Sequence, residues 1–186
     1  MIDKDSYNYA ATSYNFCFVL YPDSNSYSCE WVLSNVKSLY YNYSISNYAY
    51  ILHDSDVVVE SDVIEGRYSQ DELGNSRKPH YHLLVSFKSQ KSYRSVLKLL
   101  GLYGMYTNTD GQLQLIYPFN ASTAIVHKFR NYIKYMLHRT PDSSDKHQYD
   151  IDDLVSSDPE LISKISSDSI IIDDSALFKD IVLNHQ

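Results

Sequence analysis

Residues 79–87 read PHYHLLVSF, and this stretch decides the fold. The run is short, apolar and begins with a proline, which is typical of a buried strand. Because residues i and i+2 of a strand point to the same face, His80 and His82 project together. Two imidazoles beside an apolar strand are a common arrangement of metal ligands, although two exposed or hydrogen-bonded histidines give the same pattern.

The segments on either side of this strand alternate between strand and helix patterns. Apolar runs predict strands, and apolar residues at helical spacing predict helices. Strands are expected at residues 15–21, 47–53 and 111–119, and helices at 28–40, 89–100 and 122–139. The order β-α-β-β-α-β-α predicts an α+β fold of the ferredoxin-like split βαβ type. We expect an antiparallel sheet with helices on one face and the active site on the other.

A second group of candidate metal ligands follows the strand at 47–53, in the sequence His53-Asp54-Ser55-Asp56. If this strand pairs with 79–87, then the ends of the two strands meet and His53 joins His80 and His82. Three nitrogens and one carboxylate oxygen suit Mn²⁺ or Mg²⁺ that engages a phosphate. Asp56 is the preferred carboxylate and Asp54 the alternative, and either residue could simply belong to a turn.

The helix expected at 122–139 offers a candidate nucleophile. At about 100° per residue, its apolar side chains form one stripe. Tyr132 lies on the flank of that stripe, where packing at the edge of the core explains it. Tyr135 lies well off the stripe, so it is either a surface residue, a contact for the C-terminal segment or a functional group. A phenol is a poor nucleophile until a base or a metal assists it.

Charge is unevenly distributed along the 186 residues. The net charge of −7 argues against a nucleic-acid binder when the chain is taken whole. Residues 78–139, however, carry nine Lys or Arg and one acid, for a local charge of +8 between acidic flanks of −7 and −8. Local charge sets the field that a ligand meets, so the central segment predicts a phosphate-binding face.

Several classes of protein are disfavoured by composition. No apolar run approaches the roughly 20 residues of a membrane span, and the acidic N-terminus is unlike a secretory signal. Two cysteines form neither a disulfide framework nor a zinc site, so we expect a reducing, cytoplasmic setting and no membrane partner.

Four motifs in order resemble the rolling-circle replication initiators (Rep) of the HUH endonuclease superfamily, the small-plasmid type with one catalytic tyrosine. They span roughly residues 14–150 and are FVLYPDS at 18–24, ILHDSD at 51–56, KPHYHLLV at 78–85 and YMLH at 135–138, followed by KHQY at 146–149. Each motif alone is weak, but the ordered set is specific.

The resemblance implies a reaction and a set of roles. His53, Asp56, His80 and His82 would bind the metal, and Tyr135 would nick one DNA strand and keep a 5′-phosphotyrosine, with Tyr132 as the second candidate. Relatives often carry Tyr-x-x-Lys, whereas here Lys134 precedes Tyr135 and His138 takes the i+3 position. The cation that orients the phosphate is therefore open.

Partners follow from the same reading. Origin DNA, single-stranded at the nick, should meet the basic segment. The residues expected to contact it are Lys91, Arg94, Lys128, Arg130, Lys134 and Arg139. The chain has no GxxxxGK[ST] motif, so a host helicase would act with a host polymerase.

The chain divides into three expected parts. Residues 1–13 form a flexible N-terminus, 14–150 the endonuclease and origin-binding domain, and 151–186 an acidic, helical appendage that is either a solvated element or an oligomerisation element. Alternative functions are a single-tyrosine transposase, a viral Rep nuclease domain, a hydrolase that uses water, and a non-catalytic nucleic-acid-binding module. The last predicts aromatic pairs on the central strands, which the sequence does not clearly supply.

Overall fold

The computed structural model describes residues 10–42, 44–116 and 125–167. The strands are β1 (Thr12–Leu20), β2 (Ile45–His53), β3 (His80–Ser92), β4 (Met105–Thr107), β5 (Leu113–Leu115) and β6 (Val155–Ser156). The α-helices are α1 (Cys29–Tyr41), α2 (Glu60–Ile64), α3 (Tyr93–Leu99), α5 (Phe129–Met136) and α6 (Pro159–Ser167). Short 3₁₀ turns are η2 (Gln70–Glu72), η3 (Pro141–Ser143) and η4 (Ile151–Asp153).

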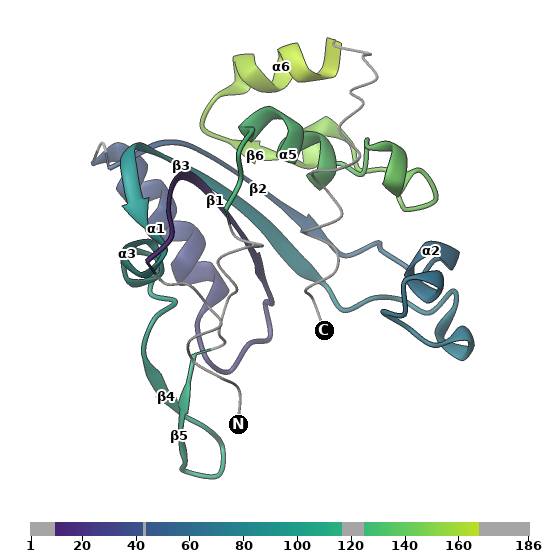
Figure 1. The fold of residues 1–186 in the computed structure, drawn as a ribbon, viewed down its shortest axis with the longest axis horizontal. Helices are drawn as coiled ribbons and strands as arrows, with labels where there is room; N and C mark the ends of the chain where they lie inside the picture. The colour runs from purple at the N-terminus through teal and green to yellow at the C-terminus, as the bar shows by residue number, and fades with distance from the viewer. Residues whose placement is uncertain (1–9, 43, 117–124, 168–186) are drawn as a thin grey trace.

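A four-stranded antiparallel sheet in the order β1-β3-β2-β6 forms the centre of the molecule (Figure 1). The expected α+β class with an antiparallel sheet is confirmed. The stretch at 79–87 belongs to β3, an inner strand of the sheet, which pairs with β1 on one side and with β2 on the other. Its register sets His53 directly opposite His80 and Ile51 opposite His82. The ends of β2 and β3 therefore meet, as the sequence predicted.

One face of the sheet packs against α1 and α3. Leu83 and Val85 of β3 point into this core, together with Val32 and Val36 of α1. Helix α1 begins where its pattern predicts, since the Ser28 side chain accepts a hydrogen bond from the Trp31 amide. This layer fixes the sheet from the side opposite the histidines.

The other face is covered as well, and here the structure differs from the sequence expectation. Leu84 of β3 and Ile51 of β2 pack against Ile133 and Met136 of α5 and Ile165 of α6. Figure 1 shows α5 and α6 on the opposite side of the sheet from α1 and α3. The reason is that the middle residues of β3 are apolar on both faces, so both faces require a cover. The histidines lie at the end of this second face.

The segment from 101 to 128 departs most from the prediction. The strand expected at 111–119 is reduced to β5, which pairs with β4 in a separate hairpin instead of joining the sheet. The helix expected from residue 122 begins only at Phe129, because Ile125 bridges to Phe16 and the Val126 amide donates to the Asn15 carbonyl. The backbone groups at the edge of β1 require hydrogen-bond partners. Residues 125 and 126 provide them in an extended conformation, although the spacing of the apolar side chains favours a helix. Residues 117–119 and 122–124 of those predictions lie outside the described residues.

The described part of the C-terminal segment packs on the sheet. Strand β6 pairs with β2, and the Tyr48 carbonyl accepts hydrogen bonds from Ser156 and Ser157. The apolar residues beyond 167 lie outside the described residues. Within the described ranges, no helix has the length and apolar character needed to cross a bilayer.

Candidate metal centre and tyrosine site

Three histidines converge at the joined ends of β2 and β3. His53, His80 and His82 are all buried, and their ligand nitrogens lie within 4.8 Å of one another. The ring centroid of His53 lies 5.3 Å from that of His80 and 4.5 Å from that of His82. Strand alternation brings His80 and His82 to one face, and strand pairing adds His53. The structure thus brings together the three imidazoles that the sequence selected.

Main-chain carbonyl groups orient two of these rings. His53 Nε2 lies 2.7 Å from the Met136 carbonyl oxygen, and His80 Nδ1 lies 2.9 Å from the Lys78 carbonyl oxygen. A carbonyl only accepts, so these nitrogens carry the protons and the opposite nitrogens present lone pairs. Metal-binding histidines commonly have such carbonyl partners. Burial also lowers the pKa of His80 to about 4, which keeps the ring neutral, as a ligand requires.

Asp56 lies beside His53, one of the three histidines, and Asp54 does not. Asp56 is buried and its Oδ2 lies 3.4 Å from His53 Nδ1, whereas Asp54 is exposed and accepts a hydrogen bond from Ser55. Burial by itself would raise the pKa of Asp56, but the neighbouring His53 and His138 rings and the hydroxyl of Tyr149 lower the pKa below its ordinary value. The carboxylate is therefore ionised at neutral pH.

The facing atoms of His53 and Asp56 form the best test of whether a metal fits. Both His53 Nδ1 and Asp56 Oδ2 are buried without a hydrogen-bond partner among the described residues. Two lone-pair atoms this close repel each other unless a proton or a cation lies between them. Imidazole nitrogens with a carboxylate oxygen suit Mn²⁺ and similar divalent ions. The donor set fits such an ion.

His138 is a site residue that the sequence analysis did not choose as a ligand. It is buried, its ring centroid is 4.6 Å from that of His53, and it forms a second possible ligand group with His53 and Asp56. Its φ of 55° is left-handed, a conformation that costs free energy for a residue other than glycine. Its Nδ1 lies 2.7 Å from the His147 carbonyl oxygen, and burial lowers its pKa to about 4. The sequence feature that could have identified His138 is its position just after the helix that carries Tyr135.

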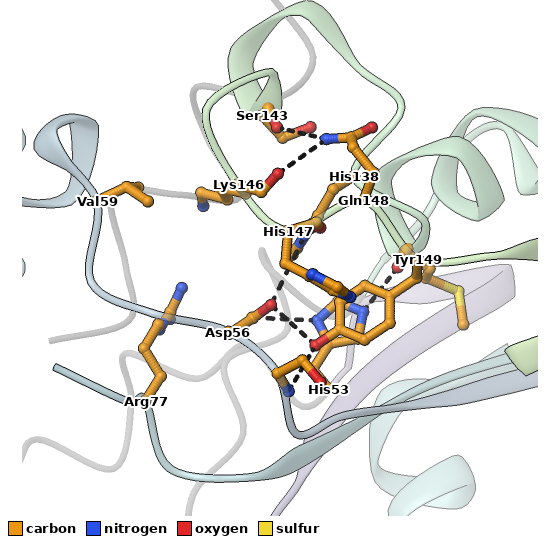
Figure 2. Close-up of polar contacts among 12 residues, drawn as sticks. His53, Asp56, Val59, Arg77, His138, Ser143, Lys146, His147, Gln148 and Tyr149 are labelled. Carbon is orange, nitrogen blue, oxygen red and sulfur yellow. Dashed lines mark hydrogen bonds and ion pairs between the residues drawn. The ribbon is translucent and has the colours of Figure 1, made fainter. Parts of the chain in front are cut away.

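Tyr149, the last residue of KHQY, locks the carboxylate in place (Figure 2). Its hydroxyl accepts from the Ser55 amide at 3.2 Å and donates to Asp56 Oδ1 at 2.9 Å. Its ring stacks on His53 with centroids 4.2 Å apart. Burial raises the pKa of Tyr149, so its hydroxyl stays protonated and remains a donor. The sequence analysis identified the KHQY motif but assigned no role to it.

Both candidate tyrosines border His82. The Tyr135 ring is 5.7 Å from the His82 ring, and the Tyr132 hydroxyl is 3.4 Å from His82 Nδ1. Tyr132 is buried in the second core, whereas Tyr135 is half-buried and packs only against its edge. Burial raises the pKa of Tyr135 to about 12, an effect that the charges of Arg77 and Arg67 oppose. The half-buried residue is the better placed to meet a ligand from outside.

The basic residues predicted to contact DNA fall into two groups. Lys128, Arg130, Lys134 and Arg139 lie on or next to α5, beside the histidines. Lys91 and Arg94 lie at the other end of β3, on the order of 35 Å along the strand from His80. Four of the six therefore lie on or next to the helix that carries Tyr135.

Comparison with known proteins adds a family match. A model described as plasmid replication protein, origin binding domain, matches residues 9–161. A replication protein of onion yellows phytoplasma (strain OY-M) is 28% identical over 61% of this chain, and one of Staphylococcus aureus is 28% identical over 76% of it. The matches cover 25% and 52% of the lengths of those proteins. The chain thus corresponds to a part of each relative.

Proposed function

This chain belongs to the family of plasmid replication protein origin-binding domains, and on that premise we propose that it nicks and rejoins one strand of origin DNA through a covalent phosphotyrosine. The observation that carries the proposal is the convergence of His53, His80 and His82 beside Tyr135. A protein that only bound DNA would not need three buried imidazoles gathered at one point, two of them oriented by main-chain carbonyl groups. A resident Mn²⁺ or Mg²⁺ would supply positive charge to the oxygens of the scissile phosphate.

The residues of the chain provide the remaining requirements. His53, His80, His82 and Asp56 would hold the metal, and His138, which forms a group with His53 and Asp56, is a further ligand candidate. Tyr149 and the carbonyl groups of Met136 and Lys78 fix the orientation of those ligands. Positions held in this way need no rearrangement when the negative charge of the phosphate grows.

Tyr135 is the proposed nucleophile. Its phenolic oxygen forms a bond to phosphorus, the bond between phosphorus and the 3′ oxygen breaks, the phenol loses its proton and the 3′ oxygen gains one. The product is a 5′-phosphotyrosine and a free 3′-hydroxyl that can prime synthesis. Because the phosphate ester is conserved, rejoining the strand needs no ATP. The raised pKa of Tyr135 means that this phenol needs nearby positive charge before it attacks.

The partners proposed for this activity are origin DNA and host replication enzymes. Lys128, Arg130, Lys134 and Arg139 lie on the site side of the molecule, where phosphate contacts would position a strand. In this proposal a host helicase separates the strands and a host polymerase extends the free 3′-hydroxyl. An oligomer formed through residues 151–186 remains part of the proposal.

One experiment tests the reaction. The full chain is incubated with Mn²⁺ and overlapping single-stranded oligonucleotides that span its replicon, and the products are separated on denaturing gels. We expect a covalent protein–DNA band that disappears in Tyr135→Phe and His80→Ala and persists in Tyr103→Phe, a matched change on an exposed tyrosine.

The outcomes separate the alternatives. Cleavage without an adduct in Tyr135→Phe would indicate that water is the nucleophile. A band that persists in Tyr135→Phe but vanishes in Tyr132→Phe would move the role by one helical turn. Specific DNA binding with neither cleavage nor adduct in the unmodified protein would leave a binding domain without catalysis.

A further inference from the structure

A second charged group lies next to the histidines, and no role has been assigned to it so far. We call it the Asp62 cluster: Asp62 of α2 with Arg67, Arg77 and Lys146. Asp62 is fully buried, and all three cations reach its carboxylate. Burying one carboxylate requires compensation by about one positive charge. The cluster provides three, of which Arg67 is also shared with Glu65.

The three cations are not held equally. Arg67 Nη2 lies 2.8 Å from Asp62 Oδ1, which is a close ion pair. Arg77 Nη1 and Lys146 Nζ each lie 3.8 Å from the carboxylate, beyond hydrogen-bond distance. Arg77 Nε is buried without a hydrogen-bond partner in the described ranges. Arg77 and Lys146 are thus positioned by the buried charge while Asp62 takes none of their hydrogen bonds.

Both cations are tied to Asp56. The Arg77 amide donates to the Asp56 carbonyl at 2.8 Å, and Lys146 precedes by three residues the Tyr149 that bonds the Asp56 side chain. Figure 2 shows Arg77 and Lys146 on one side of Asp56 and His53 on the other. The positive charge of Arg77 also acts on the pKa values of His80 and Tyr135. The charge of Lys146 acts on His138, so each of the two cations influences a residue of the site.

Enough of each side chain is exposed for a ligand to reach it. Arg77 is 20% exposed and Lys146 is 12% exposed, whereas Asp62 is completely covered. Part of each of these two side chains is thus open to solvent, whereas the carboxylate is not. Arginine suits phosphate because its planar fork donates to two oxygens, and lysine adds a compact charge.

We propose that Arg77 and Lys146 bind one phosphate of the DNA strand that enters the site, with Asp62 as the residue that positions them. The inference rests on the proposed function for the identity of the ligand. The Arg77/Lys146 pair would supply a positive charge near Tyr135. The third position after Tyr135 holds His138 instead of the lysine of the Tyr-x-x-Lys pattern. The competing explanation is that the cluster only clamps the loop between β2 and β3, which closes through the bridge between Val57 and Ser76.

The salt dependence of DNA binding tests the proposal without metal or nicking. The probe is a fluorescein-labelled single strand of 20 nucleotides of mixed sequence, titrated with the full chain in EDTA at several NaCl concentrations. Losing one phosphate contact on a single strand lowers the slope of log Kobs against log salt by about 0.7. We expect that loss in Arg77→Gln/Lys146→Gln. The charge-preserving Arg77→Lys/Lys146→Arg should keep the original slope.

Controls separate phosphate binding from folding and from net charge. Lys37→Gln/Lys164→Gln removes the same charge from α1 and α6, away from the cluster, and should keep the slope. Thermal melting of each variant reports stability, and Lys146→Gln alone replaces the double variant if the latter does not fold. A clamp without a phosphate site would lower the melting temperature and leave the slope unchanged.

The proposal is overturned if the Gln variants keep the original slope, if the control pair loses as much, or if the unmodified protein does not bind the probe. The adduct assay and the salt dependence test the nicking reaction and the phosphate site independently. A protein that forms no covalent adduct but shows the slope loss retains the phosphate site. One that forms the adduct with an unchanged slope lacks it.

Discussion

The Nε2 atom of His53 lies 2.7 Å from the main-chain carbonyl oxygen of Met136. This contact joins the end of β2 to the last turn of α5, where helical carbonyls lack partners within the helix. It requires the proton on Nε2, so the lone pair on Nδ1 faces Asp56. One hydrogen bond thus sets the tautomer of a candidate ligand and the position of the helix that carries Tyr135.

Metal binding should stabilise the chain through this centre. At a concentration 100 times its Kd, a divalent ion adds about 2.7 kcal/mol. For a protein of this size that corresponds to a rise in Tm of about 5–10 °C. We expect Mn²⁺ to produce it in differential scanning fluorimetry, and His53→Ala to abolish it. The exposed His127→Ala should respond like the unmodified protein. A Tm indifferent to Mn²⁺ would argue against the centre.

The Tyr149 hydroxyl should matter separately from the Tyr149 ring. Tyr149→Phe keeps the stacking on His53 but removes the donor to Asp56 and the acceptor for the Ser55 amide. Leaving buried polar groups unsatisfied costs about 1–3 kcal/mol. Loss of a group that orients a ligand reduces metal affinity or activity about 10–100-fold. Urea unfolding and Mn²⁺ titration measure both effects, with Tyr103→Phe as the control. Unchanged metal affinity would contradict the assigned positioning role.

Stability of the metal-free protein should fall as the pH is lowered from about 6.5 to 4. Burial lowers the pKa of His80 and His138 from 6.5 to about 4, so in this range the unfolded chain binds protons that the folded chain does not. Stability then rises with pH, by up to about 1.4 kcal/mol per pH unit for each group, and the contribution is complete above 6.5. Urea unfolding in EDTA across this range measures the dependence. His138→Gln cannot titrate and should flatten the curve, and an unchanged slope in that variant would refute the assignment.

A side chain at Gly101 should destabilise the fold more than one at Gly74. Its φ of 71° is left-handed, and a Cβ there would meet the Trp31 ring, which covers the end of α3. Gly74 has a similar φ of 84° but open space around the same position. Gly74→Ala pays only for the backbone conformation, about 1–2 kcal/mol. Gly101→Ala also displaces the ring, adding about 1–3 kcal/mol. Chemical denaturation compares the two, and equal losses would show that the ring moves away without cost.

Local sequence rules accounted for three of the four strands of the central sheet and missed β6. Apolar runs identified β1, β2 and β3, and two-residue alternation placed His80 and His82 on one face. The same rules failed around residue 125, where the demand of β1 for backbone partners is not encoded in the spacing of side chains.

By itself, the sequence determined which chemical groups gather at the end of β2 and β3, because strand period and strand pairing follow from short stretches of chain. Only the tertiary structure decided how those groups are held. Asp56 accepts a hydrogen bond from a tyrosine 93 residues away, and His53 donates one to a carbonyl 83 residues away. A backbone oxygen has no signature in the sequence, and the burial of Asp62 beneath Arg77 and Lys146 depends on how distant segments pack.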